Sequence, residues 1–188
     1  KSTLAKILCG VLRPDAGTVY LDGEALCAPG MAYDRAAGLR IQMVYQQPYA
    51  SLDPGQKLIS GFRELIRYHR LAPGRKAADE LTIRLISEVG LEPDILSHLP
   101  RQISGGEAQR IAIARCLLLS PRLLILDEAT SMLDVSTQAN VLALVRRITA
   151  GTCGAIMLIS HDLELVEHVC GRIYMFDGNH SLKECKRT

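Results

Sequence analysis

The stretch LLILDE at residues 123–128 decides the fold that the sequence predicts. Its first four residues are apolar without interruption, whereas a strand with one solvated face alternates apolar and polar residues. An unbroken apolar run is typical of a strand covered on both faces, as strands are in parallel sheets. The stretch therefore predicts a buried parallel strand that ends on two acids, Asp127 and Glu128.

Four other short runs in the sequence are rich in residues that favour β-structure. Helical patterns separate the later runs, at about residues 136–149 and 162–169. Strands that alternate with helices predict an α/β fold with a mostly parallel sheet and helices on its faces. The four runs are TVYLD at 18–22, IQMVY at 41–45, AIMLIS at 155–160 and RIYMFD at 172–177.

The middle of the chain, residues 49–116, shows helical patterns and no convincing strand. FRELIRYH at 62–69 and ADELTIRLISEVG at 78–90 both read as amphipathic helices, with a Pro/Gly loop at 71–76 between them. This segment predicts an all-α insertion within the α/β domain.

Composition narrows the class of protein. The chain has 188 residues and is 48% hydrophobic, enough for one domain with a buried core. A net charge of +2 and an aromatic content of 4% without Trp argue against a nucleic-acid partner. The six cysteines form no C-x-x-C pair, which favours reduced thiols. No signal peptide and no run of about 20 apolar residues is visible, so we expect a cytoplasmic polypeptide.

Polar residues follow three of the predicted strands. Gln46 follows 41–45, Asp127 and Glu128 end 123–128, and His161 follows 155–160. Alone, each has a plain structural interpretation as a helix cap, a solvated turn or a packed histidine. In a parallel sheet they share one edge, where ligands bind. There Asp127 suits Mg²⁺, Glu128 is free to polarise a water, Gln46 can orient that water or touch the metal, and His161 can reach a phosphoryl group.

Two helix starts carry phosphate-binding features. Ser104 and Glu107 form a capping box before an apolar helical pattern, and Gly105 and Gly106 leave that backbone approachable. Because this helix lies far along the chain from the strand ends, we expect it to serve a phosphate held mainly by a second molecule. Lys1-Ser2 opens another helix and matches the last third of G-x-x-x-x-G-K-[ST], as if the chain were cut inside its own phosphate loop.

The segments ISGGEAQR at 103–110, LLILDEATSMLD at 123–134 and LISHD at 158–162, in that order, strongly resemble the ATP-binding subunits of ABC transporters. KST resembles the end of Walker A, ISGGE the signature motif and LLILDE Walker B. Gln46 resembles the Q-loop glutamine, SMLD the D-loop and His161 the switch histidine. The resemblance runs from Lys1 to about Gly178. The sequence differs from the family pattern at three places. Ile103 replaces the commoner Leu, Glu107 replaces the commoner Gln, and the glycine-rich part of Walker A is missing.

The resemblance implies a P-loop NTPase that uses ATP and Mg²⁺. Glu128 would be the general base, with Gln46 and His161 sensing the γ-phosphate. Lys1, Ser2 and Thr3 would bind phosphate, and Ser2, Gln46 and Asp127 would serve Mg²⁺. The remaining implied nucleotide contacts, made across a dimer of two such subunits, are Ser104, Gly105, Gly106, Glu107 and Asp134.

The resemblance also implies an organisation and partners. Residues 1–188 would be one ABC ATPase domain, incomplete at its N-terminus, with a RecA-like core at 1–48 and 117–188 and a helical subdomain at 49–116. The helical subdomain would dock on a transmembrane permease at the cytoplasmic face of the inner membrane. YQQPYASLDP at 45–54 is similar to the oligopeptide, dipeptide and nickel importer branch. Two alternatives stay open: a soluble, non-transport ABC ATPase, or a truncated fragment without activity.

Overall fold

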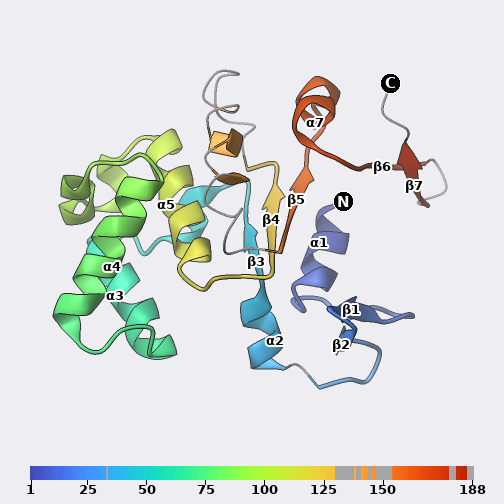
Figure 1. Cartoon of the computed structure of the whole chain (residues 1–188), viewed down its shortest axis with the longest axis horizontal. Helices are drawn as coiled ribbons and strands as arrows, with labels where there is room; N and C mark the ends of the chain where they lie inside the picture. The colour runs from blue at the N-terminus through green and yellow to red at the C-terminus, as the bar shows by residue number, and fades with distance from the viewer. Residues whose placement is uncertain are drawn as a thin grey trace.

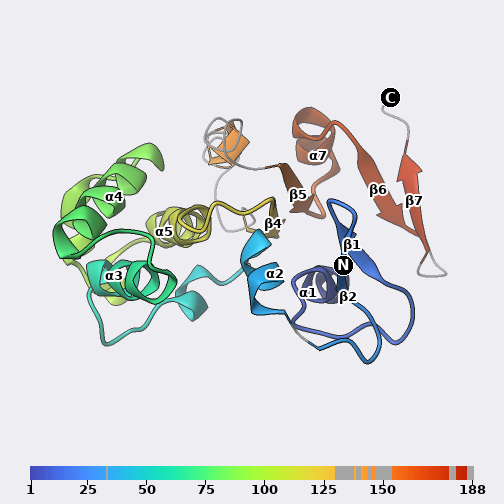
Figure 2. The same ribbon diagram turned by 60° about the horizontal axis from the view of Figure 1, so that its bottom comes forward.

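The computed structural model describes residues 1–32, 34–129, 138, 141–143, 145–146, 154–177 and 181–185. Over these residues a parallel sheet lies between a group of helices on one side and two small hairpins on the other (Figures 1 and 2). The helices are α1 Ser2–Leu8, α2 Arg35–Arg40, α3 Leu58–His69, α4 Arg75–Glu88, α5 Gly105–Leu117 and α7 Leu163–Val169, with 3₁₀ turns η1 Pro48–Ser51, η2 Pro93–Ser97 and η3 Pro100–Gln102. The strands are β1 Val19–Leu21, β2 Glu24–Cys27, β3 Ile41–Val44, β4 Leu123–Asp127, β5 Ala155–Ile159, β6 Ile173–Phe176 and β7 Leu182–Cys185.

The parallel sheet has the order β3-β4-β5, and β4 is its central strand. Leu124, Ile125 and Leu126 of β4 are fully buried, which confirms the prediction of a strand covered on both faces. Successive residues point to opposite faces, so Val44 and Leu126 pack with α5 whereas Ile125 packs with Ala5 of α1. The sheet therefore lies between two apolar layers, one built by the helices of the middle segment and one by α1.

Residues 49–116 contain helices and 3₁₀ turns and no strand, as the sequence predicts. Helix α3 buries Leu58, Phe62 and Ile66, which recur every four residues along one face. The Arg63 guanidinium donates two hydrogen bonds, of 2.6 and 2.8 Å, to the Asp79 carboxylate and so ties α3 to α4. The division of the chain into a core and a helical subdomain at 49–116 stays a prediction.

Two predicted strands occur outside the parallel sheet. β1 pairs with β2 and β6 with β7, each as a separate antiparallel hairpin. The second strand of each hairpin, and α2, were not predicted, because their sequences of four to six residues are too short to show a clear period. Apolar residues of β6 remain exposed, among them Tyr174, Met175 and Phe176.

Two predicted helices differ from the structure or lie partly outside it. The spacing of Leu4, Ile7, Leu8 and Val11 predicts one helical face. The opening helix instead ends at Leu8, so Val11 lies beyond it and is 59% exposed. Of the helix predicted at 136–149, residues 138, 141–143 and 145–146 are helical, and the rest lies outside the described residues. Val141 and Val145 are buried, as their positions in the pattern predict.

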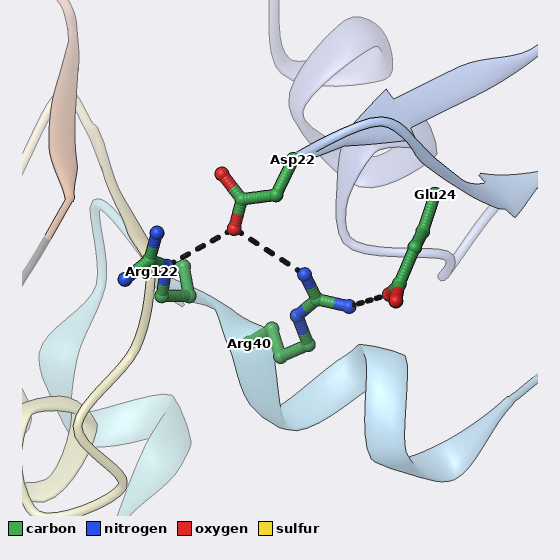
Figure 3. A network of polar contacts seen from close by, with 4 residues as sticks. All are labelled: Asp22, Glu24, Arg40 and Arg122. Atoms are coloured by element: carbon green, nitrogen blue, oxygen red, sulfur yellow. Dashed lines mark hydrogen bonds and ion pairs between the residues drawn. The ribbon is translucent and has the colours of Figure 1, made fainter.

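A network of charges fastens the β1–β2 hairpin to the amino ends of β3 and β4 (Figure 3). Asp22 and Gly23 form the hairpin turn with φ of +53° and +85°, the left-handed values that an Asp-Gly turn provides. The Asp22 carboxylate accepts hydrogen bonds from Arg122 at 3.0 Å and from Arg40 at 3.3 Å, and Arg40 also pairs with Glu24. Since Arg40 precedes β3 and Arg122 precedes β4, this network lies at the edge opposite to the strands' carboxyl ends.

Gly154 sets the start of β5 against β4. A Cβ at residue 154 would lie 2.9 Å from the Arg122 carbonyl oxygen, too close for any side chain. The same carbonyl accepts a 2.9 Å hydrogen bond from the Ala155 N–H. The two strands therefore meet here at a distance that only glycine allows.

Candidate functional site

The carboxyl edge of the parallel sheet collects the polar residues that follow its strands. Val44 pairs with Leu126, and Asp127 pairs with Ile159. Because the strands are parallel and in this register, Gln46, Glu128 and Ser160 leave the sheet at the same level. The structure thus confirms that the ends of β3, β4 and β5 share one edge.

Glu128 and His161 face each other across this edge. The Glu128 Oε1 atom lies 3.5 Å from His161 Nδ1, and the glutamate side chain is 27% exposed against 70% for the histidine. Glu128 has a φ of +48°, in the left-handed region, and its N–H donates a 2.9 Å hydrogen bond to the Ile159 carbonyl. The backbone turns sharply just after β4, and this turn aims the carboxylate at His161 instead of continuing the strand.

Asp127 is the last residue of β4 and is nearly buried, with 7% exposed. Its Oδ1 atom is inaccessible and accepts no hydrogen bond within the described structure. A buried carboxylate oxygen without a partner is costly unless a cation or water satisfies it. No group of three His, Cys, Asp or Glu side chains gathers among the described residues to hold a metal by itself. Asp127 therefore fits Mg²⁺, which takes one or two carboxylates and completes its shell with water and phosphate oxygens.

The amino end of α1 reaches the same edge. The Lys1 Nζ atom donates a 3.1 Å hydrogen bond to the Ser160 carbonyl, directly before His161. Ser2 and Thr3 are exposed in the first turn of α1, and the helix has no side-chain cap. Ala5 is fully buried against the sheet and holds the helix in place. The structure therefore brings Lys1 to the end of β5.

Two residues beside His161 shape its turn and were not assigned a role from the sequence. The Asp162 carboxylate accepts a 3.0 Å hydrogen bond from the Leu165 N–H and caps α7. The Asp162 N–H donates a 3.0 Å hydrogen bond to the Ser160 hydroxyl. An Asp directly before an apolar helical pattern is an N-cap signal, so Asp162 could have been recognised. His161 is thus held between two residues that fix its backbone.

The signature-like residues form their own group at the start of α5, on the side of α3 and α4 (Figure 1). The Glu107 carboxylate accepts hydrogen bonds from the Ser104 N–H at 2.7 Å and from the Ser104 hydroxyl at 2.8 Å, which completes the predicted capping box. The Ser104 backbone hydrogen bond is the main cause that lowers the pKa of Glu107. Gly105 has open space where a Cβ would be. In both views the start of α5 lies toward α3 and α4, away from the carboxyl ends of β4 and β5, so within one chain the two groups lie apart (Figures 1 and 2).

The remaining predicted site residues have separate outcomes. Gln46 is exposed at the edge. It directly follows Tyr45, and partial burial raises the pKa of the Tyr45 hydroxyl. Gly106 lies in the first turn of α5. Asp134 lies outside the described residues. The roles assigned to all these residues stay predictions. Among the described residues, no helix has the length and apolar character needed to cross a membrane.

Comparison with known proteins places the chain in a family. The family described as "ABC transporter" matches residues 1–131. The "Probable peptide ABC transporter ATP-binding protein y4tS" of Sinorhizobium fredii is 40% identical over 92% of this chain and 49% of its own length. The "Nickel import ATP-binding protein NikE" of Rhodospirillum rubrum is 36% identical over 100% of this chain and 68% of its own length. The chain therefore spans about half to two thirds of the length of these curated relatives.

Solved structures agree on the fold. The ATP-binding cassette MJ0796, in a dimeric post-hydrolysis state bound to ADP and Pi, matches with a TM-score of 0.80 at 23% identity, covering 98% of this chain and 80% of that one. The cbiO1 protein from Clostridium perfringens, part of the ABC transporter complex cbiONQ, matches with a TM-score of 0.75 at 22% identity, covering 92% of this chain and 67% of that one. Both matches support the P-loop NTPase fold predicted from the sequence. With the family match over residues 1–131 and relatives 36–40% identical along most of its length, the chain belongs to the ABC transporter family.

Proposed function

We propose that the protein containing this chain hydrolyses ATP to drive import through a membrane transporter. The observation that carries the proposal is the pairing of Glu128 with His161 at the sheet edge that Asp127 and Lys1 also reach. A carboxylate, an imidazole, a buried carboxylate oxygen and an amine at one edge suit a nucleotide's terminal phosphate.

In this proposal Glu128 accepts a proton from the attacking water, and Gln46 orients that water. Lys1 holds the β- and γ-phosphate oxygens, and Thr3 contacts phosphate. His161, 3.5 Å from Glu128, approaches the γ-phosphate and fixes the glutamate. The left-handed turn at Glu128 keeps the carboxylate at the edge before substrate arrives, so little reorientation is needed in the reaction.

Asp127 and Ser2, with Gln46 beside them, are the residues that would hold Mg²⁺. The orphaned Asp127 Oδ1 supports this assignment. When bound, Mg²⁺ neutralises phosphate charge.

The separation of the signature group from the edge supports a dimer of two such subunits. Ser104, Gly105, Gly106 and Glu107 would contact the nucleotide held by the other subunit, and Asp134 would lie near that interface. Phosphate suits the amino end of α5 because free N–H groups and the positive helix end point there.

A transmembrane permease is the proposed membrane partner, which places the protein at the cytoplasmic face of the membrane. We propose that the permease contacts the helical segment near β3, where a hollow of about 190 Å³ is lined by residues that include Tyr45, Gln47, Pro48, Ser51 and Arg115. The names of the relatives, a peptide transporter protein and a nickel import protein, support a peptide or nickel as the transported substrate.

Replacement of Glu128 by Gln in the full-length protein tests the proposal. Gln keeps the shape of the side chain but cannot accept the proton, so we expect turnover to fall at least about a hundredfold while ATP-dependent dimerisation persists. Unchanged turnover would refute the base assignment, and absence of ATP-dependent dimerisation would refute the two-subunit arrangement. The exposed Glu92, replaced by Gln, is the matched control.

A further inference from the structure

The residues after Gln46 make a direct contact with the signature loop. The Tyr49 hydroxyl donates a 2.9 Å hydrogen bond to the Ile103 carbonyl, across 54 residues of sequence. Ile103 is the residue directly before Ser104, the N-cap of α5. We call residues 46–52 the glutamine segment. The Tyr49 side chain of this segment therefore holds the backbone directly before Ser104.

The turn that carries Tyr49 is held by contacts at both ends. Pro48 and Leu52 are buried on either side of it, and the Ser51 hydroxyl donates a 2.7 Å hydrogen bond to the Pro48 carbonyl. At its far end the Arg115 guanidinium donates to the Ser51 carbonyl. Since Arg115 lies near the end of α5 and Ile103 just before its start, η1 lies along the helix and is attached at both ends.

The acceptor side of the contact is also well placed. The Ile103 side chain is buried in the core, with 8% exposed, so the residue cannot turn freely to compensate for a lost contact. Ile103 and Ser104 both have extended backbone, at φ of −114° and −73°, and lead straight into the capping box with Glu107. A shift of the Ile103 carbonyl therefore moves the Ser104 hydroxyl.

We propose that Tyr49 is a positioning residue that couples Gln46 to Ser104: its hydroxyl, through the Ile103 carbonyl, sets the signature loop according to the position of the glutamine segment. The inference rests on the proposed function, in which Gln46 orients the attacking water at one nucleotide and Ser104 contacts the other nucleotide. Occupancy of a subunit's own site would thereby prepare its signature loop for the nucleotide of the partner subunit.

The test uses the full-length protein with Glu128→Gln as the parent, so that the ATP-bound dimer accumulates. Tyr49→Phe removes only the hydroxyl, and Tyr68→Phe, at a tyrosine that is 69% exposed in the same helical segment, is the matched control. We expect Tyr49→Phe to weaken ATP-dependent dimerisation about fivefold, as for one lost hydrogen bond, and to leave ATP affinity of the dilute monomer unchanged. Sedimentation measures the first quantity and a fluorescent ATP analogue the second.

A double-mutant cycle separates this role from a merely structural one. If Tyr49 acts through Ser104, Tyr49→Phe has no further effect on dimerisation once Ser104 is Ala. The same fivefold loss in both backgrounds, or dimerisation equal to the Tyr68→Phe control, would overturn the inference and leave the proposed function standing. A parent that does not dimerise with ATP would overturn the proposed function and this inference with it.

Discussion

The Glu128 N–H donates a 2.9 Å hydrogen bond to the Ile159 carbonyl while Glu128 itself holds a φ of +48°. A backbone in the left-handed region is strained for most residues with a Cβ, glutamate among them, whereas Asn and Asp adopt it more readily. Here a bond between the ends of β4 and β5 holds the strained residue in place. The strain lies at the carboxylate that we assign as the base, where it fixes the direction of the side chain.

Comparison of Glu128→Gly with Glu128→Ala measures this strain. Both variants lose the carboxylate, but only Gly adopts the left-handed backbone without a steric cost. We expect Glu128→Gly to have a free energy of unfolding about 1 kcal/mol higher than Glu128→Ala, after the greater flexibility of Gly in the unfolded chain is allowed for. Urea unfolding measures the difference, and equal stabilities would show that the turn is unstrained.

The capping box at the start of α5 should contribute to the stability of the folded protein. Glu107→Ala removes the acceptor of two hydrogen bonds from Ser104 and should lower the free energy of unfolding by about 1 kcal/mol. Glu107→Gln retains an acceptor oxygen and should cost less. Glu92, which precedes η2 without a side-chain cap, is the control, and its replacement by Ala should change little. Chemical denaturation of the four proteins checks the order, and an equal effect at Glu92 and Glu107 would contradict it.

Asp22 makes stability depend on pH and salt. The hydrogen bond from Arg122 is the largest cause that lowers the pKa of Asp22, and Arg40 adds to it. Because the folded-state pKa is lower than the unfolded one, the stabilisation is complete above the ordinary carboxyl pKa and is lost as pH falls through the folded value.

Asp22→Asn tests this dependence, because Asn also tolerates the left-handed turn. The variant should unfold at lower temperature than the wild type at neutral pH and low salt. This difference in unfolding temperature should disappear in acid and become smaller in high salt. Asp15→Asn, at an exposed acid in the loop before β1, is the control. If the difference in unfolding temperature stays constant with pH, the charge of Asp22 does not contribute to stability.

The thiols of Cys9 and Cys116 should be unreactive in the folded protein. Burial raises the pKa of Cys9 to about 11 and that of Cys116 to about 12, and the thiolate is the reactive form. We expect iodoacetamide at pH 8 to modify both at least about a hundredfold more slowly in the native protein than in urea. Mass spectrometry of the peptides measures the rates, and similar rates in both states would show that the thiols are open to solvent.

The sequence predicts the parallel strands well, because β4 and β5 contain unbroken apolar runs and polar residues come at or just after the end of all three strands. LLILDE gives both the position of β4 and the chemistry at its end. Hydrophobic spacing likewise predicts a helix at 62–69, which is the later part of α3; the helix itself begins four residues earlier, at Leu58. The sequence also predicts that the ends of β3, β4 and β5 meet, because parallel pairing brings their carboxyl ends to one edge.

Other features depend on contacts between distant residues and carry no local signal. The strand β7 reads LKEC, which has no apolar alternation, and it exists because β6 pairs with it. The contact of Tyr49 with Ile103, and that of Asp22 with Arg122, join residues 54 and 100 positions apart. The opening helix was extended too far, because Val11 continued its apolar spacing although the helix ends at Leu8.

Gly154 has a consequence for how variation is tolerated in this protein. A methyl group at this position would push against the Arg122 carbonyl and force the first residues of β5 away from β4. The other end of β5 leads into His161, so a displacement that begins at one rim of the sheet would be carried along a single strand to the opposite rim. Natural variants at residue 154 should therefore be depleted as strongly as those at the nucleotide edge, although the glycine contributes no functional group.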